Sequence, residues 1–146
     1  MARTVESLLR SNQVVGRIIR DFASLESYID YIILYSFARN GKLIEFYNAV
    51  LDEIGFIQKI RILKKLAASG RFPTLSKALF KRIETFRKLR NTLAHRAIID
   101  GTAIEDLDDN CYDLLERFPR RYNTALRGAK LTLKRVADRL ESKLQS

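Results

Sequence analysis

One short segment, Arg90-Asn91-Thr92-Leu93-Ala94-His95, gathers residue types that can act on a phosphodiester. His95 is the sole histidine of the chain, and an imidazole with a pKa of about 6.5 can take or give a proton near neutral pH. Arg90 offers a planar fork of N–H donors that suits a phosphate. On an α-helix Asn91 and His95 share a face one turn apart, whereas Arg90 lies roughly 140° round from His95.

These side chains match the requirements of RNA cleavage without a metal. A base removes the ribose 2′-OH proton, a cation stabilises the pentacoordinate phosphate, and an acid protonates the leaving 5′ oxygen. One histidine can fill one proton role, so an enzyme of this kind is expected to be a two-fold homodimer that shares a cleft. No metal or cofactor is expected, because no second His or Cys lies near enough for a metal site and the sequence has no glycine-rich phosphate loop.

Charge along the chain favours an anionic partner. The net charge is +10, which suits nucleic acid or an acidic antagonist protein. Residues 57–96 carry twelve Lys or Arg and one acid, residues 100–116 carry seven acids and no Lys or Arg, and residues 117–146 carry nine Lys or Arg and two acids. The first stretch leads into Arg90 and His95, so basic helices are expected to form a track for a phosphate backbone. Solvated Lys-rich faces of ordinary amphipathic helices are the alternative.

Helical periodicity dominates the parts of the sequence that must position the Arg90–His95 segment. Apolar residues recur at steps of three and four along the longer of the expected helices, which is the helical pattern. The expected helices are a short one near 5–9 and longer ones over 13–37, 43–68 (with a break or bend at Gly55), 75–95 (with Thr74 as N-cap) and 120–143.

The residue pattern changes after the Arg90–His95 motif. β-branched residues on both sides of Asp100-Gly101 predict a short hairpin over 97–104, and an acidic stretch follows over 105–116. Residues 1–146 are expected to form one domain. With one cysteine, no signal core and no apolar run of about 18 residues, a cytoplasmic protein without a membrane span is expected.

The motif resembles that of the HEPN superfamily, in which an Arg precedes a His by a short spacer and a polar residue follows the Arg. Phe22-Ala23-Ser24-Leu25-Glu26 resembles the acidic position of the superfamily on a helix that faces the cleft. Gly55-Phe56-Ile57-Gln58-Lys59-Ile60 resembles a segment of its abortive-infection branches. The resemblance covers roughly residues 14–140.

The resemblance implies an all-α bundle of four or five helices, with a small β-hairpin after the motif helix, that dimerises and joins two motifs in one groove. It implies a metal-independent RNA endonuclease that leaves 2′,3′-cyclic phosphate ends and serves as a toxin or an antiphage effector. Ala97 stands where a toxin branch carries a Tyr that a partner nucleotidyltransferase modifies.

Residue roles follow from the motif and its neighbours. His95 is the candidate general base or acid, Arg90 the phosphate stabiliser and Asn91 a polar helper. Glu26 is expected to orient Arg90 or His95. The remaining candidates are cations expected to contact RNA phosphates: Lys59, Arg87 and Arg96.

Two other function classes stay open from the sequence. One is a non-catalytic HEPN-like module that binds RNA or a protein, such as an acidic antitoxin or regulator. The other is a DNA-binding regulator, which the lack of a convincing helix-turn-helix pattern disfavours.

Overall fold

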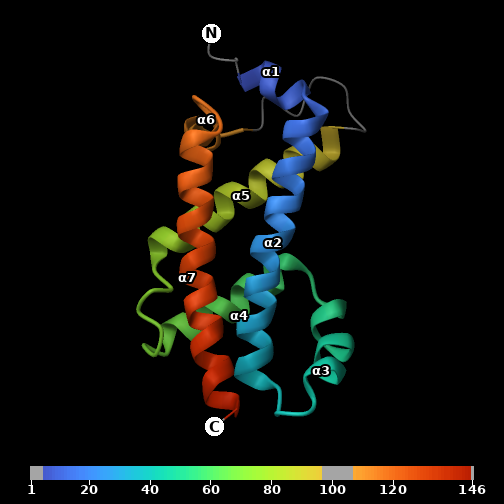
Figure 1. Cartoon of the computed structure of the whole chain (residues 1–146), viewed down its shortest axis with the longest axis vertical. Helices are drawn as coiled ribbons and strands as arrows, with labels where there is room; N and C mark the ends of the chain where they lie inside the picture. The colour runs from blue at the N-terminus through green and yellow to red at the C-terminus, as the bar shows by residue number, and fades with distance from the viewer. Residues whose placement is uncertain (1–4, 97–106, 146) are drawn as a thin grey trace. The chain divides into compact units, whose positions relative to one another are not determined.

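The structure is a computed structural model that describes residues 5–96 and 107–145, with the backbone alone described for His95 and Arg96. Within these ranges the chain forms helices and no strand, which confirms the all-α class (Figure 1). The elements are α1 Val5–Arg10, α2 Asn12–Phe37, α3 Leu43–Ala49, the 3-10 turn η1 Leu51–Glu53, α4 Phe56–Ala68, α5 Lys77–Arg96, α6 Asp109–Leu115 and α7 Arg120–Gln145. The hairpin predicted over 97–104 lies outside the described residues.

Helix bounds follow the sequence signals closely, with two corrections. The helix expected over 43–68 ends at Ala49, and its interruption includes η1 as well as Gly55. The predicted break at Gly55 is real, because Gly55 takes an extended conformation at the N-cap of α4. Thr74, however, is not the N-cap of α5, which begins at Lys77. The Leu75 amide donates to the Phe72 carbonyl at 3.0 Å, which places Thr74 inside a turn that precedes the helix. No helix in the described ranges has the length and apolarity to span a bilayer.

The chain divides into two compact units. Unit 1 comprises Met1–Ser24 and Ala78–Ala129, and unit 2 comprises Leu25–Lys77 and Lys130–Ser146. Each unit draws on helices from both halves of the sequence, so α2 and α7 contribute residues to both.

Unit 1 buries an aromatic centre on α7. Tyr122 is fully buried, and its ring meets Phe86 edge to face at 5.7 Å between centroids. Its hydroxyl donates to Asp21 Oδ2 at 2.9 Å, which satisfies the one polar atom of the ring. Burial and this hydrogen bond raise the pKa of Tyr122 well above its ordinary value. Together with Phe86, the other buried apolar residues of α5 in this core recur at steps of three and four, as the helical pattern predicts: Leu79, Ile83, Leu89 and Leu93.

Unit 2 encloses a lysine between two carboxylates. Lys59 on α4 is only 6% exposed, and its Nζ donates to Glu26 Oε2 at 2.9 Å. The same Nζ forms an ion pair with Asp30 Oδ1 at 2.8 Å. Burial raises the pKa of Asp30 although Lys59 opposes the shift. Burial also works against the charge on Lys59, but its two carboxylate partners outweigh that effect and raise the pKa of Lys59.

Removal of Lys59 should therefore leave two carboxylates without their cation. We expect Lys59→Met to lower the free energy of unfolding by about 3 kcal/mol, because an uncompensated buried charge is costly. Urea denaturation followed by circular dichroism measures this value. Lys65→Met, at an exposed position of the same helix, is the matched control; equal losses for the two variants would contradict the role assigned to the buried cluster.

Candidate functional site

The motif lies on the last two turns of α5, in unit 1. Arg90 is partly exposed, and its guanidinium carbon stands 4.7 Å from the centroid of the Phe22 ring. Phe22 itself is buried on α2, at 4% exposure. A guanidinium over an aromatic face is held by the ring quadrupole, a contact worth about 0.5–2 kcal/mol. The ring thus fixes one side of the Arg90 guanidinium.

One donor of Arg90 lacks a partner. The Nε atom is buried and has no hydrogen bond with any part of the chain that the structure describes. Such an unsatisfied donor costs about 1–3 kcal/mol, and it is uncommon in native proteins. Because the residue as a whole is partly exposed, atoms other than Nε meet solvent. Arg90 is therefore a partly exposed cation that an aromatic ring holds on one side.

Asn91 and His95 occupy another face of the same helix. Asn91 is partly exposed, and α5 stays helical through Arg96. A regular helix places the Cα atoms of Asn91 and His95 on one face and that of Arg90 roughly 140° round from His95. The side chains of His95 and Arg96 lie outside the described part, so their predicted roles in proton transfer and RNA contact stay predictions.

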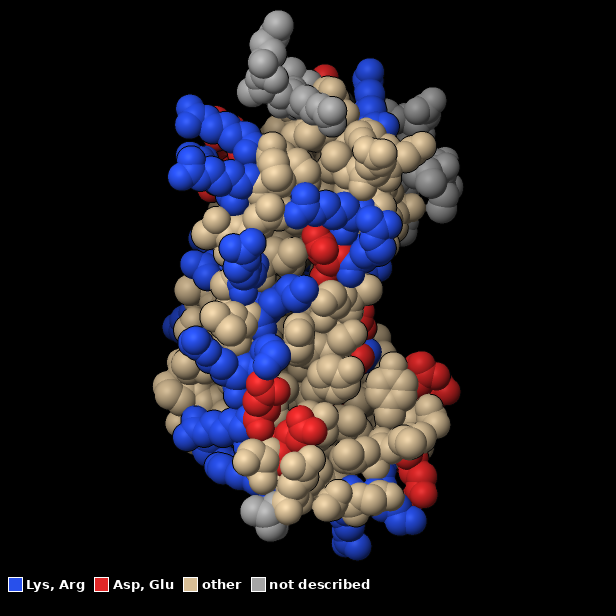
Figure 2. Space-filling view, in the orientation of Figure 1, with Lys and Arg blue, Asp and Glu red and all other residues tan. Residues whose placement is uncertain are grey.

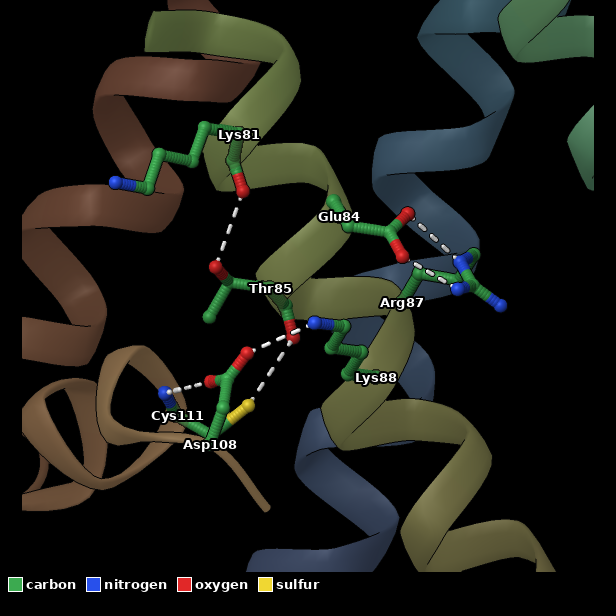
Figure 3. A network of polar contacts seen from close by, with 7 residues as sticks. All are labelled: Lys81, Glu84, Thr85, Arg87, Lys88, Asp108 and Cys111. Carbon is green, nitrogen blue, oxygen red and sulfur yellow. Dashed lines mark hydrogen bonds and ion pairs between the residues drawn. The ribbon is translucent and has the colours of Figure 1, made fainter. Parts of the chain in front are cut away.

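A polar network joins α5 to the start of α6 (Figure 3). Lys88 Nζ donates to Asp108 Oδ2 at 2.8 Å, and Asp108 Oδ1 accepts from the Cys111 amide at 3.0 Å as the N-cap of α6. The hydrogen bond from Lys88, followed by that from the Cys111 amide, lowers the pKa of Asp108 to about 2. The buried Cys111 thiol reaches the Thr85 carbonyl at 3.8 Å. These contacts hold α6 against the turn of α5 that precedes the motif.

Arg87 is engaged within its own helix. Its Nε donates to Glu84 Oε2 at 2.8 Å and its Nη2 donates to Glu84 Oε1, as Figure 3 shows. The Glu84 hydrogen bonds raise the pKa of Arg87. The predicted contact of Arg87 with RNA stays a prediction, and it requires donors that Glu84 does not occupy.

Two other predicted site residues lie in unit 2. Glu26 accepts from Lys59 at 2.9 Å, and its role in orienting Arg90 or His95 stays a prediction. Lys59 is shielded from solvent and held by two carboxylates. The predicted contact of Lys59 with RNA stays a prediction, and it requires the buried ammonium to become accessible.

Sequence reasoning missed two partners that the structure reveals. The contact of Phe22 with Arg90 is one of them, because nothing in the spacing links residues on distant helices. Asp30 was not singled out, although it follows Glu26 by four residues and so shares its helix face. That spacing was the available signal for a shared cation such as Lys59.

The described residues include no group of three or more His, Cys, Asp or Glu side chains able to hold a metal ion. Comparison of the chain with protein-family models, with curated proteins and with solved structures finds no match.

The Asp108 cap should be visible in pH-dependent stability. A carboxyl whose folded-state pKa is lowered stabilises the fold above its ordinary pKa, and the effect is lost as pH falls toward the folded-state value of about 2. We expect Asp108→Ala to cost about 1 kcal/mol at neutral pH. The cost should shrink as the solution is acidified, as measured by urea denaturation across a pH series. Asp108→Asn, which keeps a capping oxygen, should cost less at neutral pH; an equal loss would contradict the capping role.

The contact between Arg90 and Phe22 can be isolated by a double-mutant cycle. We expect Phe22→Leu and Arg90→Met to show a coupling free energy of about 0.5–2 kcal/mol in unfolding experiments. The control cycle pairs Phe22→Leu with Arg127→Met, at an exposed position of α7. A coupling no larger than that of the control would show that the ring does not hold the guanidinium in solution.

Proposed function

We propose that this chain is a metal-independent RNA endonuclease of the HEPN type, active as a homodimer, in which Arg90 and His95 act on the scissile phosphate. The observation that carries the proposal is the state of Arg90. Its guanidinium is oriented by the Phe22 ring, and its buried Nε has no partner in the described chain. The single histidine follows five residues later on the same helix. Phosphodiester cleavage requires an oriented cation together with a group that can exchange a proton near neutral pH.

The proposed reaction is an internal transesterification. A base takes the proton of the ribose 2′-OH, and the 2′ oxygen forms a bond to phosphorus while the bond from phosphorus to the 5′ oxygen breaks. An acid delivers a proton to that leaving oxygen. The products are a 2′,3′-cyclic phosphate and a free 5′-OH. In this scheme His95 supplies one proton transfer, Arg90 stabilises the charge on the phosphorane, and Asn91 positions a phosphate or ribose oxygen.

Helix geometry supports two protomers per catalytic cleft. Because α5 stays helical through Arg96, the Arg90 and His95 positions are roughly 140° apart around the helix axis. One protomer therefore presents the two groups on different faces, and a second copy related by two-fold symmetry brings another Arg and another His. The second histidine also supplies the proton role that the first one cannot fill at the same time.

The test compares wild type, His95→Ala and Arg90→Lys on labelled single-stranded and structured RNA in EDTA. We expect His95→Ala to lose about 10²-fold or more in cleavage rate, because a general acid or base contributes 10²–10⁴-fold. Arg90→Lys should also lose activity, since Lys keeps the charge but not the planar fork. Arg139→Lys, at an exposed position of α7, is the control and should match wild type. Circular dichroism and sedimentation should show the same fold and a dimer for every variant.

The identity of the products decides between the function classes. Cyclic phosphate ends made by wild type alone would support the catalytic proposal. An active His95→Ala variant would overturn the assigned site. If wild type binds RNA and leaves it intact, the result would favour the non-catalytic module. The next step would then be to identify a protein partner, such as an acidic antitoxin.

A further inference from the structure

Unit 1 contains an open groove that none of the predicted site residues lines. Its volume is about 890 Å³, and it is lined by residues of α5, α6, α7 and the turn that joins the last two. We call it the basic groove, after its exposed cations Lys81, Arg82, Arg117 and Arg120. Figure 2 shows Lys and Arg side chains gathered along the edge where the start of α5 and the first turns of α7 lie in Figure 1. A volume of this size falls in the range of ligand sites, about 300–1,000 Å³.

The positive charge of the basic groove is uncompensated. Its four named cations form no salt bridge with any residue in the described ranges. The one acid in the lining, Asp113, is already paired with Arg121 at 2.6 Å between Oδ1 and Nη1. An anion entering the groove therefore meets cations that have no competing partner there.

The basic groove is separate from the motif. Lys81 lies nine residues before Arg90 on α5, which is about 13 Å along the helix axis. The α5 positions that line the groove, Ala78, Lys81, Arg82 and Thr85, centre roughly 130° round the helix from Arg90. A ligand in the groove therefore contacts a different face of α5 from a phosphate bound at Arg90.

We propose that the basic groove binds the phosphodiester backbone of a single nucleic-acid strand, as a site distinct from the Arg90–His95 motif. Three of its four uncompensated cations are Arg, whose planar fork matches phosphate oxygens two at a time. No aromatic side chain occurs in the groove lining, so contact is with phosphate and sugar and tolerates any sequence. Binding here does not rest on the catalysis proposed for the motif.

Gly128 of α7 is among the residues that line the groove. A Cβ added at Gly128 would stand 3.7 Å from Arg82 Nη1, in ordinary contact distance. A larger side chain at this position extends into the groove toward the Arg82 guanidinium and leaves the net charge unchanged. Gly128→Leu therefore blocks the groove by volume alone, and Leu is a better helix former than Gly, so α7 keeps its stability.

The backbone at Arg117 offers a second variant that separates binding from folding. Its φ of 53° lies in the left-handed region, which an arginine rarely adopts and a glycine adopts freely. Arg117→Gly removes a groove cation and relieves the backbone, so its melting temperature should equal or exceed that of wild type while its affinity falls.

The test measures binding of a fluorescent 2′-O-methylated oligouridylate by anisotropy in EDTA. This probe lacks the 2′-OH nucleophile, so a failure to bind is distinct from a failure to cleave. The groove variant combines Lys81→Gln, Arg82→Gln and Arg120→Gln. The control combines Arg61→Gln, Lys65→Gln and Arg139→Gln, which remove the same charge from exposed positions in unit 2.

We expect the groove variant to weaken binding about tenfold or more at moderate salt. The slope of log affinity against log salt should fall by about 2, since each phosphate contact on a single strand contributes about 0.7. The control should change affinity much less, and Gly128→Leu should weaken binding at unchanged charge. Titration of labelled wild type should shift the amide resonances of Ala125 and Gly128, which line the groove.

Several results would overturn the proposal. Equal losses for the groove and control variants would show that the charge acts without a site. Full affinity in Gly128→Leu would show that the strand does not enter the groove. Tighter capture of polyglutamate than of the oligonucleotide would assign the surface to an acidic protein. An oligothymidylate arm shows whether the strand is read as a phosphodiester backbone alone, as we expect, or requires the ribose.

Discussion

The apolar stripe of α5 is the constraint on which the arrangement of unit 1 depends. The helix must turn Leu79, Ile83, Phe86, Leu89 and Leu93 toward the core, where all five are buried. At 3.6 residues per turn, this requirement sets the direction of every other side chain on the helix. Arg90 falls within the arc that the stripe spans, which explains why its guanidinium meets the buried Phe22 ring although the residue is partly exposed. Lys81 and Arg82 fall on another side and line the basic groove.

The Lys and Arg residues of this chain have different structural roles although their chemistry is similar. Lys59 is enclosed by carboxylates and holds two helices of unit 2 together. Lys88 reinforces the cap of α6, whereas the groove cations have no described acid to neutralise them. Of these three groups, the groove cations alone keep their full field for a ligand, because a paired cation has already given most of its interaction energy to a neighbour. A net charge of +10 is therefore a poor guide to binding until the paired cations have been set aside.

Much of the fold could be predicted from the sequence, because helical periodicity is a local signal. The buried faces of α5 and α7 and the interruption at Gly55 were all predictable from residue types and their spacing. The sequence predicts that α5 begins at residue 75, whereas the helix begins at Lys77. Residues Phe72–Leu75 form a turn in which Leu75 is buried, and Thr74 does not cap the helix.

The candidate site was harder to predict, because its contacts join distant parts of the chain. The motif itself is contiguous, so Arg90, Asn91 and His95 could be singled out by type and spacing. The Phe22 ring beneath Arg90 and the Asp108 cap beside Lys88 could not, since each pairing depends on how helices pack. Lys59 was expected among exposed cations, and only the placement of its two acidic neighbours explains its burial. The basic groove likewise exists only where three helices meet.

The buried thiol of Cys111 has a practical consequence. It is the one cysteine of the chain, and burial, followed by its hydrogen bond with Asp108, raises its pKa to about 12. Because thiolate is the reactive form, the native cysteine is almost inert toward maleimides and spin-label reagents near neutral pH. A cysteine introduced at an exposed position is therefore the one thiol that such reagents modify quickly. Fluorophores or paired spin labels can thus be attached at chosen points without first replacing the native residue.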